Sequence, residues 1–135
     1  MLKEYALKYY DKNYDLNCAE TIMYAANEAY NLNLPKEVFK TMSAFGGGLA
    51  VEEVCGAITG AAAVLGIMFT EERAHESAKI KELTKELMER FKKELNMNNC
   101  AELKAQYKKD DEVRCGKMIE TSADILEDII NRERK

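Results

Sequence analysis

The residues most able to do chemistry in this chain are its four cysteines, Cys18, Cys55, Cys100 and Cys115. A cysteine thiolate is both a nucleophile toward disulfides and a ligand for metal ions. Their separations of 37, 45 and 15 positions include no CxxC pair of the kind that most zinc and iron–sulfur sites use. The spacing therefore favours dithiol–disulfide chemistry, with a metal site as the alternative.

Two glycine-containing segments lie near the second cysteine. Cys55 begins the hexapeptide CGAITG, which places Gly56 and Gly60 inside an expected helix. Each such glycine costs about 0.5–1 kcal/mol relative to alanine. We therefore expect another helix to pack closely here, or a second thiol or a bound group to lie near Cys55. The other segment, Gly46-Gly47-Gly48, is predicted to end a helix rather than to cradle a phosphate, because no GKS or GKT sequence follows.

Hydrophobic periodicity and capping residues divide the chain into the helices that must position these cysteines. Asn17 and Glu20 form a capping-box pattern, and the four letters NCAE at 17–20 occur again at 99–102. Thr70 is predicted to cap a long charged helix, and Asp110 or Asp111 to cap the last one. The expected helices cover residues 2–11, 18–30, 35–44, 52–69 and 71–95, a segment from 100, and a final segment containing 115–129.

Each cysteine falls on the inward side of an expected helix, and Cys18, Cys100 and Cys115 lie at or near helix starts. The positive end of a helix dipole stabilises a thiolate and can lower the pKa of a cysteine from about 8.5 to roughly 3.5–7.5. Glu20 and Glu102 oppose this effect, and burial raises the pKa of a thiol. We expect the four thiols to lie near one another at one end of the fold.

The composition predicts one all-α domain over residues 1–135. One proline and seven glycines leave little room for the turns of an all-β chain, and 47% hydrophobic residues fit a single core. The expected architecture is a bundle of about five to seven helices around the Gly/Ala-rich helix of Val54 to Phe69. A net charge of -4 disfavours nucleic acid as a partner.

Other features bear on compartment and assembly. The longest apolar run, from Val54 to Phe69, is shorter than the roughly 20 residues that span a membrane, so we expect no stable membrane span. The N-terminal sequence MLKEYALKYYDK is unlike a signal peptide, which indicates a cytoplasmic protein, where stable disulfides are rare. The lone His75 is expected at the surface and cannot build a histidine-based metal site. The small-residue face of the 54–69 helix, or a stripe on the long helix, is a candidate homodimer surface.

The order of these cysteines resembles a known family. The motif C-G-A-x-x-G at 55–60, with one cysteine before it and two after it, is similar to the small redox-active proteins named for the pattern C_GCAxxG_C_C. The resemblance covers nearly the whole chain and implies redox activity without identifying a substrate or an electron partner. It implies a site made of Cys18, Cys55, Cys100 and Cys115, with Gly56, Ala57 and Gly60 in support.

We therefore predict thiol-based redox chemistry, either dithiol–disulfide exchange or electron transfer through the four-cysteine site, and a candidate thiol–disulfide oxidoreductase. Cys18 with Cys55 and Cys100 with Cys115 are candidate pairs, although four cysteines allow three connectivities. Dithiol chemistry requires no cofactor. The alternatives are an iron–sulfur cluster or zinc bound by the same four residues, and a helical interaction module whose buried cysteines are inert.

Overall fold

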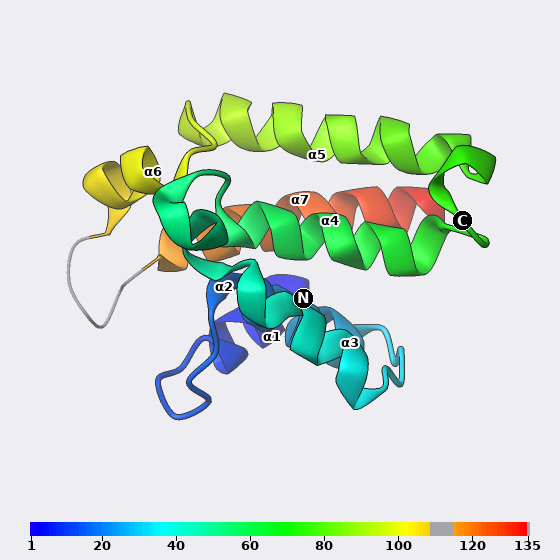
Figure 1. Ribbon diagram of the computed structural model, residues 1–135, viewed down its shortest axis with the longest axis horizontal. Helices are drawn as coiled ribbons and strands as arrows, with labels where there is room; N and C mark the ends of the chain where they lie inside the picture. Colours follow the sequence, from blue (N-terminus) through cyan, green and yellow to red (C-terminus); the bar gives the residue numbers. More distant parts are fainter. Residues whose placement is uncertain (109–114, 135) are drawn as a thin grey trace.

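The computed structural model describes residues 1–108 and 115–134, and over these residues the protein is all-α, as predicted (Figure 1). Two 3-10 turns, at Met42–Ala44 and Ala74–Glu76, and a wide turn at Gly48–Glu52, closed by a hydrogen bond from the backbone N–H of Glu53 to the carbonyl oxygen of Gly48, lie between the helices. The helices of the described ranges are α1 (Leu2–Tyr9), α2 (Cys18–Ala29), α3 (Lys36–Thr41), α4 (Gly56–Phe69), α5 (Ala78–Leu95), α6 (Cys100–Tyr107) and α7 (Gly116–Glu133).

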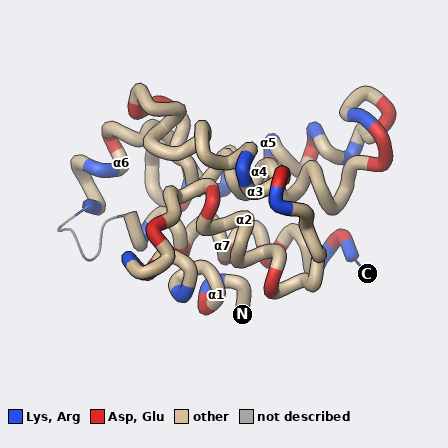
Figure 2. The backbone as a smooth tube through the Cα atoms, turned by 60° about the horizontal axis from the view of Figure 1, so that its bottom comes forward, with Lys and Arg blue, Asp and Glu red and all other residues tan. Residues whose placement is uncertain are grey.

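Helix α4 lies at the centre of the bundle, as the Gly/Ala-rich run predicted. It packs against α2, α5 and α7, while α1 packs against α2 and α7. Ala57, Ala61 and Val64 are completely buried, and α4 carries no charged residue, whereas acidic and basic residues spread over the other helices (Figure 2). Helices α4 and α7 both begin at the end of the molecule where α6 lies (Figure 1).

Two glycines of α4 allow α2 to approach it closely. A Cβ atom on Gly60 would lie 2.7 Å from the backbone oxygen of Ala19, and one on Gly56 would lie 3.1 Å from Cβ of Cys18. Any side chain at these positions would therefore push the two helices apart. The expected close helix partner of this face is α2, and its first residue is Cys18. Gly66, further along α4, has no such neighbour.

The predicted start of α4 at Glu52 is wrong, because α4 begins at Gly56. Val54 instead forms an isolated antiparallel bridge with Asn99. The backbone N–H of Cys55 donates to the carbonyl oxygen of Asn98 at 2.9 Å, and that of Cys100 donates to the carbonyl oxygen of Glu53. These long-range hydrogen bonds satisfy backbone groups that a longer helix would use within itself.

The predicted start of α5 at Glu71 is also wrong, because α5 begins at Ala78. Thr70 is the C-cap of α4 in an extended conformation and does not cap α5. The hydroxyl of Ser77 accepts a 3.0 Å hydrogen bond from the backbone N–H of Glu71, which closes the intervening turn. His75 in this turn is exposed, as predicted. The predicted cap of α7 at Asp110 or Asp111 lies outside the described residues.

Within the described ranges, none of the helices combines the length and the apolar character needed to cross a membrane.

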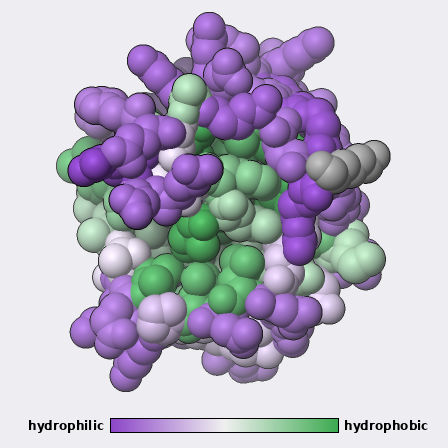
Figure 3. Space-filling view, turned by 90° about the vertical axis from the view of Figure 1, so that its right-hand side faces the viewer, coloured by the Kyte–Doolittle hydropathy of each residue, from purple (hydrophilic) through white to green (hydrophobic). Residues whose placement is uncertain are grey.

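The end of the molecule that faces away from α6 shows an apolar area bordered by polar side chains (Figure 3). On α4, Ile67 is 38% exposed, although half of the residues of this helix are buried. A homodimer surface on α4 stays a prediction.

Candidate functional site

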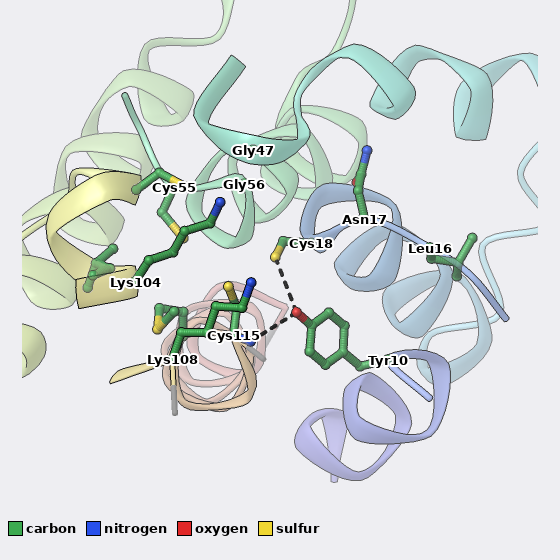
Figure 4. Close-up of a pocket in the computed structure, with 13 residues that line it drawn as sticks. Tyr10, Leu16, Asn17, Cys18, Gly47, Cys55, Gly56, Lys104, Lys108 and Cys115 are labelled. Atoms are coloured by element: carbon green, nitrogen blue, oxygen red, sulfur yellow. Dashed lines mark hydrogen bonds between the residues drawn. The ribbon is translucent and has the colours of Figure 1, made fainter. Parts of the chain in front are cut away.

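All four cysteines line one pocket, at the end of the bundle where α2, α4, α6 and α7 begin (Figure 4). The pocket encloses about 190 Å³. Cys55, Cys100 and Cys115 are buried at its walls, and Cys18 is partly exposed. The structure thus brings together the four residues that the sequence analysis placed in one site.

Each cysteine stands at the start of a helix. Cys18 and Cys100 are the first residues of α2 and α6, whereas Cys55 and Cys115 are the N-cap residues of α4 and α7. The sequence analysis placed Cys55 inside a helix, and the later start of α4 changes its position. Four sets of backbone N–H groups at helix starts therefore surround the pocket, an arrangement that favours negative charge.

The two NCAE sequences have the same structural role at two of these helix starts. The Asn17 side chain accepts a hydrogen bond from the backbone N–H of Glu20 at 2.8 Å, and Glu20 accepts one from the backbone N–H of Asn17 at 2.9 Å. This pair is the predicted capping box. Asn99 accepts hydrogen bonds from the backbone N–H groups of Ala101 and Glu102. Each asparagine therefore fixes the helix turn that carries the following cysteine.

The Gly46-Gly47-Gly48 segment is part of the pocket wall. Gly47 lines the pocket with a left-handed φ of 62°. A Cβ atom on Gly46 would lie 2.6 Å from the side chain of Asn17, and one on Gly48 would lie 2.7 Å from Cβ of Cys100. This segment follows the 3-10 turn at Met42–Ala44. Because its glycines have no side chains, its backbone can lie against the side chains of Asn17 and Cys100.

The side chains of Cys18 and Cys115 line the same pocket and shift each other's pKa, and the hydroxyl of Tyr10 reaches both residues. Tyr10 Oη lies 3.9 Å from Sγ of Cys18 and accepts a 3.0 Å hydrogen bond from the backbone N–H of Cys115 (Figure 4). The cluster therefore joins the C-cap of α1, the first residue of α2 and the N-cap of α7. This grouping of Cys18 with Cys115 differs from both candidate pairs of the sequence analysis, and the disulfide pairing stays a prediction.

The two thiols of this pair have opposite acid–base behaviour. The interaction with Cys18 is the main cause that lowers the pKa of Cys115 to about 6, and Tyr10, Lys104 and Lys108 lower it further. The same interaction, together with burial, raises the pKa of Cys18 well above its ordinary value. The pair therefore favours the thiolate form of Cys115 and the protonated form of Cys18.

Cys55 and Cys100 remain protonated at neutral pH. Burial raises the pKa of the Cys55 thiol to about 12, although backbone N–H groups at the start of α4 oppose this rise. Burial also raises the pKa of Cys100, and the nearby ammonium of Lys104 reduces the effect. One thiolate among three thiols is the ionisation state that this pocket favours.

Among the described residues, the metal alternative has no preformed group of ligands to support it. Within 1–108 and 115–134, no three side chains of cysteine, histidine, aspartate or glutamate are arranged to hold a metal ion together. A zinc or four-cysteine iron–sulfur site needs four converging ligands. Cys55 and Cys100 are buried at separate helix starts, and binding of a metal by the four cysteines stays a prediction.

Sequence reasoning missed three side chains of the pocket: Tyr10, Lys104 and Lys108. The two lysines follow Cys100 by four and eight residues, a spacing that places side chains on one helix face, so this signal was available. Tyr10 lies four residues after the buried Ala6, but its contact with Cys115 spans 105 residues and is visible only in the fold.

These features define an all-helical protein whose four cysteines form a thiol site at converging helix starts. A family model described as "Putative redox-active protein (C_GCAxxG_C_C)" matches residues 16–129. The chain belongs to this family, as the motif at 55–60 indicated. No curated protein and no solved structure matches the chain.

Proposed function

We propose that this protein cycles between dithiol and disulfide states at Cys18 and Cys115 and is a thiol–disulfide oxidoreductase. The observation that carries the proposal is that Cys18 and Cys115 line one pocket and share the hydroxyl of Tyr10, which lies 3.9 Å from Sγ of Cys18 and 3.0 Å from the backbone nitrogen of Cys115. The lowered pKa of Cys115 supports the same pair. Exchange requires an attacking thiolate and a neighbouring thiol that resolves the mixed disulfide, and an attacking thiol works best when its pKa is near the ambient pH. Cys115 is the attacking residue and Cys18 the resolving one.

The pair also supplies a reason for the order of the two steps. The Cys115 thiolate is the main cause of the high pKa of Cys18, so Cys18 stays protonated while Cys115 is free. When Cys115 forms a mixed disulfide, that negative charge disappears and the pKa of Cys18 falls. Cys18 then becomes the better nucleophile and attacks the sulfur of Cys115. The product is a Cys18–Cys115 disulfide.

Cys55 and Cys100 serve as pocket walls in this step, because their raised pKa values make them poor nucleophiles. A cycle that returns to the dithiol state suits a reducing compartment, so we place the protein in the cytoplasm. Its electron partner would be a second dithiol, since exchange passes two electrons between sulfur pairs.

The test combines metal analysis with counting of free thiols in protein purified without oxygen, before and after a mild oxidant. We expect four thiols at first, two after oxidation, and a disulfide-linked pair of peptides that contains Cys18 and Cys115. Cys115→Ser and Cys18→Ser should each abolish this disulfide. Cys55→Ser is the matched control, because this residue lines the same pocket and should leave the disulfide intact.

Two results would contradict the proposal. Stoichiometric zinc, or iron with sulfide, that is lost when any one cysteine is replaced by serine would establish the metal alternative. Four thiols that persist after oxidation of folded protein would indicate inert buried cysteines in a helical interaction module.

A further inference from the structure

We propose that the oxidant reduced at this site is a small disulfide that carries negative charge. The inference rests on the proposed function of Cys115 and Cys18 and adds the class of substrate. Two properties of the pocket support it, its dimensions and the sign of its charged side chains.

The substrate must be small because the attacking sulfur lies inside the pocket. Cys115 is only 8% exposed, so a disulfide on the surface of a folded protein would not reach it. The pocket volume of about 190 Å³ is also below the roughly 300–1,000 Å³ of sites that take drug-sized ligands. A disulfide with short arms fits these limits.

The charged side chains of the pocket favour an anion. Among the described residues that line it, the charged ones are Lys104 and Lys108, and no aspartate or glutamate belongs to the lining. Both side chains extend across the pocket toward the cysteines (Figure 4). Their charges act on the Cys115 sulfur, where both lower the thiol pKa. A carboxylate on either arm of the substrate would therefore lie within reach of an ammonium group.

The position of Lys104 is fixed by an ion pair outside the pocket. Its Nζ lies 3.2 Å from a carboxylate oxygen of Glu52, which is half exposed and absent from the pocket lining. This pair reduces the net charge that Lys104 presents, and Lys108 on the next turn adds a second cation. The cationic side chains on the described part of the lining raise the local concentration of anionic ligands.

The reaction balances with the disulfide as the oxidant. The Cys115 thiolate attacks one substrate sulfur, the substrate S–S bond breaks, and one half leaves as a thiolate that takes a proton from water. The Cys18 thiol then loses its proton and attacks the Cys115 sulfur, and the second half leaves in the same way. The substrate gains two electrons and becomes two thiols, and the protein dithiol becomes a disulfide.

The test uses three disulfides with arms of similar length and different charge: 3,3′-dithiodipropionate, bis(2-hydroxyethyl) disulfide and cystamine. The rate of single-turnover oxidation of the reduced protein is measured with each disulfide. This rate is divided by the rate at which free 2-mercaptoethanol reacts with the same disulfide, which corrects for the intrinsic reactivity of the compound. We expect the anionic compound to react at least about threefold faster than the neutral one on this scale, from a factor of about three for the Lys108 charge alone with unit charges about 7 Å apart in water, because Glu52 offsets part of the Lys104 charge. Cystamine should be the slowest.

Lys108→Gln is the informative variant because Lys108 has no part in the Glu52 ion pair. It should reduce the anionic-to-neutral ratio about threefold. The ratio is the readout, since loss of the lysine also raises the pKa of Cys115 and slows all three disulfides equally. Lys81→Gln is the matched control, because Lys81 is exposed in the first turn of α5, away from α6. It should leave the ratio unchanged.

Two outcomes distinguish a failure of the anionic-substrate inference from a failure of the proposed dithiol function. Rapid oxidation by all three compounds with the same normalised rate would overturn the anionic substrate and leave the dithiol function standing. Failure of every disulfide to oxidise Cys18 and Cys115 would overturn both.

Discussion

Cys18 and Cys115 differ chemically although both are cysteines at helix starts. The difference comes mainly from the effect of each side chain on the other, which lowers the pKa of Cys115 and raises the pKa of Cys18. Tyr10 adds to it, because its hydroxyl lies near Sγ of Cys18 and accepts the backbone N–H of Cys115. A helix start alone does not make a thiolate, since Cys55 has one and its pKa is raised to about 12 by burial.

Tyr10→Phe should change both stability and thiol ionisation. The buried N–H of Cys115 loses its acceptor, which should lower the free energy of unfolding by about 1–3 kcal/mol. The pKa of Cys115 should rise from about 6, because the hydroxyl that lowers it is absent. The ultraviolet absorbance of the thiolate, measured against pH, gives the midpoint, and urea unfolding gives the stability.

Cys18→Ala is the comparison, because Cys18 contributes most to the low pKa of Cys115. It should move the midpoint further upward than Tyr10→Phe does. A midpoint near 6 in both variants would mean that neither neighbour stabilises the thiolate.

At the scale of elements, the site depends on contacts between helix backbones. The close approach of α2 and α4 at Gly56 and Gly60 places Cys18 beside the start of α4. The bridge between Val54 and Asn99 joins the starts of α4 and α6, and so fixes where Cys55 and Cys100 enter the pocket. Small residues and caps therefore determine the positions of the thiols as much as the core does.

Gly60→Ala should destabilise the protein by about 1–3 kcal/mol, because the added Cβ would lie 2.7 Å from a backbone oxygen of α2. Gly66→Ala is the matched control in the same helix, where a Cβ meets no neighbour within 4 Å. It should stabilise the protein by up to about 1 kcal/mol through helix propensity. Thermal unfolding of both variants measures whether Gly60→Ala lowers the stability and Gly66→Ala raises it. Equal changes in stability would show that the packing of α2 against α4 does not depend on the glycine contact.

At the scale of the whole molecule, local patterns predicted more of the fold than of the site. Periodicity, capping patterns and one proline together predicted each helix of the described residues, and the capping box at Asn17 located the start of α2, because these signals act over a few residues. The starts of α4 and α5 were misplaced because the bridge from Val54 and the turn closed by Ser77 override local preference.

Less of the cysteine site than of the fold could be predicted from the sequence. The gathering of four cysteines followed from their inward positions, but their pairing depends on how α1, α2 and α7 pack. The contact of Tyr10 with Cys115 crosses 105 positions, and no periodicity encodes it.

The ionised thiol also makes stability depend on pH and on redox state. The pKa of Cys115 is about 6 in the folded protein and has an ordinary value of 9.0, so between these values the unfolded chain binds a proton that the folded protein does not. The stability of the reduced protein should therefore rise with pH across this window and lose this contribution as pH falls through about 6. Above pH 9 it should fall again, because Cys18, Cys55 and Cys100 have raised pKa values and hold protons that the unfolded chain releases.

The oxidised protein has no thiol at Cys18 or Cys115 and should lack the rise between pH 6 and 9. Urea unfolding of both redox forms across this range measures the effect, and reduced Cys115→Ser is the control, since serine does not titrate there. Parallel pH profiles for reduced wild type and Cys115→Ser would show that Cys115 is not ionised in the folded state, which would remove the attacking thiolate from the proposed mechanism. A rise confined to the reduced wild type would tie the thiolate to the fold as a whole, because only a packed pocket can make the Cys115 sulfur a stronger acid than it is in the unfolded chain.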